Sequence, residues 1–131
     1  MATLLTLRDE TTAGNYREAV TLSLPEPTIT ARELIRARVF EEVKLYNQKL
    51  ADRFEGLVQP EGSERERDGF RLHQPSKLDW HEQSRAALEA FERNGFLLLV
   101  DDRQIETLEE EIRVRSDTRV TFLKLVPLMG G

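Results

Sequence analysis

The sequence predicts an α+β fold in which a mixed sheet of four to five strands is crossed by one long helix. Three observations lead to this prediction: two short alternating segments near the N-terminus, a long amphipathic segment after them, and a last apolar alternating segment near the C-terminus. The long helix has one apolar stripe and therefore needs one sheet face to cover. Because this helix separates the strands, it also allows a parallel pairing, which a tight turn does not.

Residues 2–9 and 16–24 are predicted to be the two strands of a hairpin. Leu5 and Leu7 share one face of the first strand by period-two alternation. The intervening residues 10–15 contain glycine and asparagine, which is typical of a turn. The chain is therefore expected to begin with an antiparallel pair.

The long helix has a well-marked start. Thr30 is a suitable N-cap, and Glu33 follows three residues later, which together form a capping box. Gly56 could end the helix in a left-handed conformation. The apolar stripe has helical spacing for about six turns and consists of Ile35, Val39, Val43, Tyr46, Leu50 and Phe54.

Residues 57–95 are predicted to be an insertion, with a solvated loop at 57–75 and a second helix at 76–94. The loop mixes proline, glycine, serine and alternating charges. Ser76 or Asp79 could cap the helix, and one of its faces carries Trp80, Ala87, Leu88 and Phe91. These aromatic residues could pack on the body, which is slightly favoured, or form a surface for self-association or a partner.

The remaining elements are predicted to be mostly strands. Residues 96–100 form a continuous apolar run of strand length, and 103–105 follow after a turn as a short edge strand. Residues 106–112 are expected to form a single helical turn. Residues 118–126 are expected to form the last strand.

Two registers of the last strand are open. One register places Leu123 and Leu125 in the core and Lys124 outside. The other buries Lys124, which is costly without a partner. The first register is therefore preferred. Pro127 cannot donate to a strand ladder, so it is expected to mark the point where a tail, residues 127–131, leaves the sheet.

Composition narrows the class of protein. The 131 residues are expected to form one domain, 1–131. The net charge of −5 argues against a nucleic-acid surface, which would be basic. The chain has no cysteine, no apolar run long enough for a membrane span and no N-terminal signal pattern, so a reducing, cytoplasmic location is expected.

Neither a metal site nor a catalytic side chain is predicted. His73 and His81 have irregular spacing and no cysteine to complete a metal site. Ser84 has no neighbouring histidine and aspartate to activate it. The chain is therefore expected not to be an enzyme and to bind no cofactor.

Four fragments, in order, resemble ubiquitin and its β-grasp relatives. The fragments are TLSLPEPTIT (21–30), ADRFEGL (51–57), RQIETLEEEI (103–112) and TFLKLVPLMGG (121–131). The resemblance covers about residues 2–56 and 96–131, and the insertion has no counterpart in ubiquitin. The chain is most similar to the bacterial ubiquitin-like proteins that accompany E1-like, E2-like and JAB-type peptidase partners. The resemblance implies a ubiquitin-like β-grasp roll and a protein modifier, with a link to antiphage defence.

The resemblance also implies how such a modifier reacts. Its terminal carboxylate, here that of Gly131, is activated by an E1-like enzyme with ATP, passed to an enzyme cysteine as a thioester, and transferred to an amine of a target protein. Glycines without a Cβ can thread a narrow enzyme channel. Ubiquitin has arginines before its glycines, whereas this chain has apolar residues, so a dedicated enzyme with an apolar channel is expected. The residues expected to be recognised in the tail are Pro127, Leu128, Met129 and Gly130, and those nearest to the ubiquitin docking patch are Leu99 and Val126.

Two alternatives remain open. A β-grasp sulfur carrier would share the diglycine and carry sulfur as a terminal thiocarboxylate, although such proteins are typically shorter. A ubiquitin-like interaction module would not be conjugated at all. Deletion of Gly130 and Gly131 would abolish the function of a modifier or of a sulfur carrier, and would leave the function of an interaction module intact.

Overall fold

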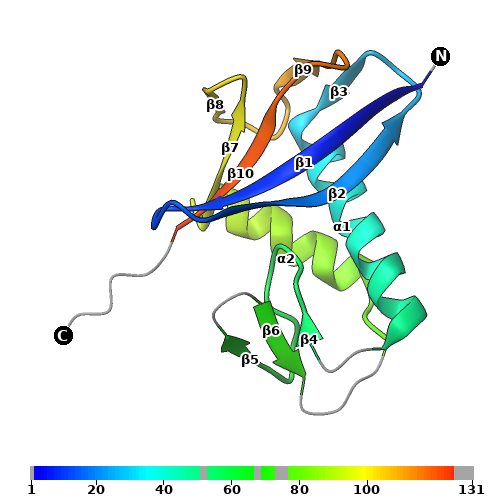
Figure 1. Ribbon diagram of the computed structural model, residues 1–131, viewed down its shortest axis with the longest axis vertical. Coiled ribbons are helices and arrows are strands. Elements are labelled where there is room, and N and C mark those ends of the chain that lie inside the picture. Colours follow the sequence, from blue (N-terminus) through cyan, green and yellow to red (C-terminus); the bar gives the residue numbers. More distant parts are fainter. Residues whose placement is uncertain (1, 51–52, 67–68, 73–76, 126–131) are drawn as a thin grey trace.

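The computed structural model describes residues 2–50, 53–66, 69–72 and 77–125. Over these residues the chain is an α+β structure with a mixed five-stranded sheet, two helices and two smaller sheets (Figure 1). The elements in chain order are β1 (Thr3–Thr11), β2 (Tyr16–Leu24), β3 (Thr28–Thr30), α1 (Ala31–Lys49), β4 (Arg53–Phe54), β5 (Ser63–Glu66), β6 (Gly69–Leu72), α2 (Trp80–Glu92), β7 (Phe96–Val100), β8 (Arg103–Ile105), β9 (Glu111–Arg113) and β10 (Val120–Lys124).

The five-stranded sheet has the order β2-β1-β10-β7-β8. β1 pairs antiparallel with β2 and parallel with β10, so the strands nearest the two ends of the chain lie side by side (Figure 1). In the parallel pair Leu7 lies opposite Val120. The predicted hairpin and the predicted mixed sheet are therefore confirmed.

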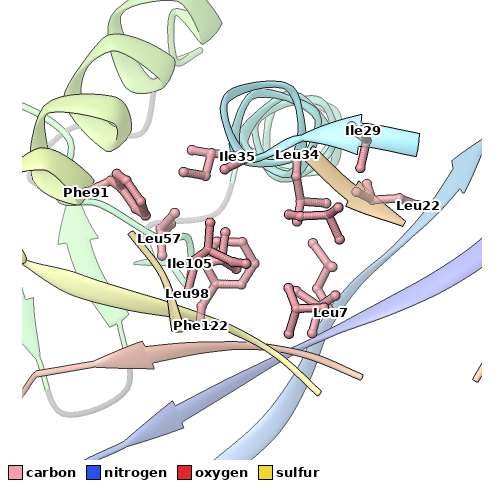
Figure 2. Packing of buried hydrophobic residues seen from close by; sticks show 14 of the residues in the cluster. Leu7, Leu22, Ile29, Leu34, Ile35, Leu57, Phe91, Leu98, Ile105 and Phe122 are labelled. Carbon is pink, nitrogen blue, oxygen red and sulfur yellow. The ribbon is translucent and has the colours of Figure 1, made fainter. Parts of the chain in front are cut away.

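Alternate residues of the sheet point towards the helices and form the core. Leu7, Leu98 and Phe122 come from three neighbouring strands and are fully buried. Figure 2 shows their side chains converging with that of Ile35 from α1. Leu57, from the insertion, lies in the same cluster. The insertion is therefore packed into the main core.

α1 begins as predicted but ends earlier. The Thr30 hydroxyl accepts a hydrogen bond from the backbone N–H of Glu33 at 3.1 Å, and the Glu33 carboxylate accepts one from the backbone N–H of Thr30 at 3.3 Å. The prediction of a cap at Gly56 is wrong, because Leu50 adopts the left-handed conformation (φ 50°) and ends the helix. Phe54 therefore lies in β4, although it is buried as expected.

The insertion is more ordered than the sequence predicts. Residues 57–75 were expected to form a loop, but they contain β5 and β6, which form a small sheet of order β4-β6-β5. Phe54 of β4 and Leu72 of β6 are buried against Tyr46 of α1 in a second, smaller core. The alternating charges of this segment hid two short strands, of which β6 carries Leu72 into that core.

α2 lies within the range predicted for it, with Asp79 as its N-cap. The Asp79 carboxylate accepts a hydrogen bond from the backbone N–H of His81 at 2.9 Å, whereas Ser76 lies outside the described residues. Of the predicted face, Ala87 and Phe91 are buried and Trp80 and Leu88 are partly buried. In the described ranges, neither helix is long and apolar enough to cross a membrane.

Residues 106–112 do not form the predicted helical turn. The carbonyl oxygens of Leu108 and Glu110 accept hydrogen bonds from the backbone N–H groups of Arg32 and Ala31, both at 2.9 Å. These N–H groups belong to the first turn of α1 and have no partner within the helix. The segment is turned and extended in the structure. In this conformation its carbonyl oxygens accept the hydrogen bonds of N–H groups that have no partner within α1.

We predict that Thr30→Ala lowers the free energy of unfolding by about 1 kcal/mol, because one of the unpaired donors of α1 loses its acceptor. Thr30→Ser keeps the hydroxyl and is the matched control, with a stability close to that of the wild type. Urea unfolding followed by circular dichroism measures both variants. Equal stability of the alanine and serine variants would contradict this account of the cap.

Candidate functional site

The structure shows the base of the predicted tail. Leu125 follows β10 directly and is 37% exposed. The prediction that Leu125 lies in the core is therefore wrong. One residue of the predicted docking patch and all of the predicted tail lie outside the described residues: Val126, Pro127, Leu128, Met129, Gly130 and Gly131. The candidate site therefore consists of the groups that hold the end of β10.

β10 does not have the predicted register. Lys124 shares the helix-facing side with Phe122, while Leu123 points to the opposite face. Lys124 Nζ donates a hydrogen bond to the carbonyl oxygen of Gly56 at 3.2 Å and lies 3.5 Å from the carboxylate of Asp9. The prediction that Lys124 faces outwards is wrong. It assumed that a buried Lys124 would have no partner, but the carboxylate of Asp9 and the carbonyl oxygen of Gly56 are its partners.

Arg38 of α1 lies beside Lys124, and its side chain is completely buried. Its guanidinium donates to both oxygens of the Asp9 carboxylate, with an Nη2–Oδ2 distance of 2.8 Å, and its Nε donates to Glu42. The guanidinium also lies over the ring of Phe122, 4.5 Å from its centroid. This combination of a two-pronged carboxylate contact and aromatic stacking is specific to arginine. One buried cation thus connects β1, α1 and β10.

Residues 55–57, where the insertion begins, are held against this group from two sides. On the side of α1, the Glu42 carboxylate accepts a hydrogen bond from the backbone N–H of Leu57 at 2.8 Å. On the side of β2, Arg17 donates to the carbonyl oxygen of Glu55 and, at 3.1 Å, to its carboxylate. The same arginine lies 3.7 Å from the carboxylate of Asp9. We refer to the five connected charged residues, Asp9, Arg17, Arg38, Glu42 and Lys124, as the tail-base cluster.

Gly56 is required at this place for a reason other than a helix cap. A Cβ on Gly56 would overlap the ring of Phe54 and the carboxylate of Glu42. Only glycine lets the backbone pass close enough to offer its carbonyl oxygen to Lys124 while its neighbour donates to Glu42.

The pKa shifts in the cluster follow from burial and from the opposite charges. Burial opposes ionisation of Asp9, but the hydrogen bond and charge of Arg38, with the charges of Lys124 and Arg17, outweigh it and lower the pKa of this carboxyl. Burial would lower the pKa of Arg38, but Glu42 and Asp9 raise it. The pKa of Lys124 is lowered, mainly by burial. The charge of Asp9 raises this pKa and the charge of Arg38 lowers it further, so burial outweighs the effect of Asp9.

Sequence reasoning missed Asp9, Arg38 and Glu42, although a signal was present. Asp9 continues the alternation that buries Leu7, so it points to the core side of β1. Arg38 and Glu42 are four residues apart and border the apolar stripe of α1. Asp9 occupies a core-facing position of β1, and Arg38 and Glu42 occupy core-facing positions of α1. Opposite charges at core-facing positions of two elements that pack together indicate a buried ion pair.

Leu99, predicted as part of a docking patch, lies on the face of the sheet opposite the helices. It is partly buried and lies opposite Thr121 of β10. Leu97 and Leu123 are opposite each other in the same strand pair and are also partly buried on this face. The second predicted patch residue, Val126, lies outside the described residues.

The two aromatic residues of the insertion have different environments. Phe91 is buried in the main core, 6.1 Å from the ring of Phe96. Trp80 is partly buried and contacts Phe40 edge to face at 5.5 Å. These last two rings line a surface groove of about 390 Å³ beside β2. The expectation that the insertion mediates self-association stays a prediction.

The structure also places the residues for which no chemistry was predicted. His81 lies in the first turn of α2 and contacts the ring of Trp80, with 4.5 Å between centroids, while His73 lies outside the described residues. Ser84 is buried in α2. Among the described residues, no group of three or more histidine, aspartate and glutamate side chains is placed to hold a metal ion.

We predict that Asp9→Asn lowers the free energy of unfolding at pH 7 by about 3–5 kcal/mol, because it removes one carboxylate from a buried cation. The pKa of Asp9 is lowered in the folded protein, so its contribution is present above the unfolded value of 3.8 and is lost as the pH falls through the folded value. The difference between wild type and variant should therefore shrink below pH 3.8. Denaturant unfolding across pH measures it, with the exposed Asp117→Asn as control. A constant difference at all pH values would contradict the assignment.

We also predict that Gly56→Ala lowers the free energy of unfolding by about 1–3 kcal/mol through overpacking and moves the NMR resonance of the Leu57 amide, which donates to Glu42. Gly62→Ala is the comparison, because its site has open space but a φ of +71°, so it adds backbone strain alone. The Leu57 resonance should be unchanged in that variant. An unchanged resonance in both variants would contradict the close approach at Gly56.

No protein-family model matches this chain, and searches of the curated proteins and of the solved structures found no match either. The function proposed below therefore rests on the chain's own residues and on the arrangement described above.

Proposed function

We propose that the chain is a ubiquitin-like protein modifier with a β-grasp body, joined to target proteins through the carboxylate of Gly131. The observation that carries the proposal is the course of the last strand. β10 lies next to β1 in a mixed sheet covered by α1, and the sequence after it continues through an apolar segment to Gly130 and Gly131. In a modifier this order serves to present a slim reactive carboxylate beside a recognisable body.

The chemistry requires no catalytic side chain from the modifier. A carboxylate oxygen of Gly131 attacks the α-phosphate of ATP, pyrophosphate leaves, and an acyl-adenylate forms on an E1-like enzyme. An enzyme cysteine thiolate then displaces AMP to give a thioester. A target amine finally displaces the thiolate and loses a proton, which leaves an isopeptide bond. The modifier contributes reach, a tail without side-chain bulk at its end, and a docking surface.

The body offers a surface for such docking. The outer face of the sheet carries Leu97, Leu99 and Leu123 at adjacent positions, and Thr121 lies opposite Leu99. Both helices pack on the other face, so a partner could contact this side of the sheet directly. We propose that the E1-like and E2-like enzymes bind here and that a JAB-type peptidase reverses the conjugation.

The proposal predicts a specific remnant on target proteins. Trypsin cleaves after Lys124, so every modified lysine should carry the peptide LVPLMGG. The experiment is mass spectrometry of conjugates recovered from the native host through an N-terminal tag. The remnant is the same whether Gly131 is the last residue made or is exposed by processing.

A variant without Gly130 and Gly131 is the control and should give no such remnant. Sulfur in place of a terminal oxygen on the free protein, with no remnant on other proteins, would instead indicate a sulfur carrier. An unmodified terminus, together with full function of the deletion variant, would contradict conjugation and support an interaction module.

A further inference from the structure

The end of β10 is held by a charged side chain that is largely buried. Phe122 and Lys124 occupy successive helix-facing positions, and only 29% of the Lys124 side chain is exposed. The pKa of Lys124 is lowered mainly by burial, so the folded protein disfavours its charge. Burial makes an ammonium without partners costly at this position. A lysine here therefore needs a structural reason.

The contacts of Lys124 provide that reason. Its Nζ reaches the carbonyl oxygen of Gly56, directly before the insertion, and the carboxylate of Asp9 in β1. Gly56 is itself fixed, because its two neighbours are bound to α1 and β2 through Glu42 and Arg17. The last side chain of β10 is thus bound to β1, which pairs with β10 as far as Lys124, and to Gly56, which belongs to no strand of the sheet.

We propose that Lys124 and Gly56 form a clamp that sets the point and direction in which the chain leaves the sheet. Gly56, at the start of the insertion, is the fixed side of this clamp, because its neighbours are bound to α1 and β2. This inference deepens the proposed function, since an activating enzyme has to find both the body and the carboxylate. A fixed departure point lowers the conformational entropy lost when the enzyme binds both. Lys124 is a positioning residue in this account.

The clamp also separates Lys124 from the other lysines as an acceptor for chains of this protein. Conjugation would require its amine to leave both Asp9 and Gly56 and to lose its charge. Lys44, Lys49 and Lys77 are exposed on the surface. Chains, where they form, are therefore expected on these three residues.

The test measures the free protein and needs no partner enzyme. The chain has no cysteine, so Gln48→Cys on the exposed side of α1 and Leu125→Cys after β10 accept two spin labels uniquely. Pulsed electron resonance gives the distance distribution between the labels. We expect one narrow distribution for the otherwise wild-type chain. With Lys124→Met, which keeps the apolar stem, the ratio of clamped to released chain should fall about tenfold, as expected for loss of one charge-assisted hydrogen bond.

Two further variants sharpen the result. Lys124→Arg keeps the charge and should retain most of the narrow component, and Lys44→Met removes a charge from the exposed part of α1 and should change nothing. Thermal unfolding of each labelled variant shows that the body remains folded. If Lys124→Met fails to fold, the width of the distribution in the otherwise wild-type chain still tests the clamp, because a broad distribution would overturn it.

Identical distributions for wild type and Lys124→Met, or a broad distribution in the wild type, would overturn the clamp. Neither result would bear on conjugation, which the LVPLMGG remnant tests separately. Conversely, a narrow distribution that Lys124→Met broadens would uphold the clamp even if no conjugates were found.

Discussion

The buried charge of Arg38 is the constraint on which the rest of the structure depends. A guanidinium cannot give up its proton to avoid burial, so the fold has to surround it with opposite charge. Asp9 comes from β1 and Glu42 from the next turn of α1, and the ring of Phe122 covers the guanidinium from β10. The position of the long helix over the centre of the sheet is therefore specified by hydrogen bonds as well as by apolar packing.

The same cluster explains how an insertion can be part of the body. Glu42 uses one oxygen for Arg38 and the other for the backbone of Leu57, whose side chain then enters the main core. Removing the insertion would leave one oxygen of Glu42 without its partner and empty the part of the main core that holds Leu57 and Phe91, which Figure 2 shows next to each other. The insertion is therefore a structural component of the site at the base of the tail.

Local signals made the hairpin, the start of α1 and the buried strand at 96–100 predictable. The Thr30 cap depends only on residues three apart, and alternation needs only a few neighbours. The errors concern long-range partners. Whether Lys124 faces inwards depends on Gly56, far away in the chain, and the end of α1 at Leu50 depends on a left-handed conformation that leucine rarely adopts. The tail-base cluster was missed because its charges are distributed over four elements, β1, β2, α1 and β10.

The central claim is that the carboxylate of Gly131 is the reactive group, and thioester formation tests it most directly. The protein would be prepared with a free C-terminal carboxylate and, by semisynthesis, with a C-terminal amide, and each would be added to an extract of the native host with and without ATP. The account predicts an ATP-dependent adduct on an enzyme cysteine that forms with the free carboxylate only and is cleaved by a thiol reductant. Equal adducts with both forms, or none that depends on ATP, would contradict it.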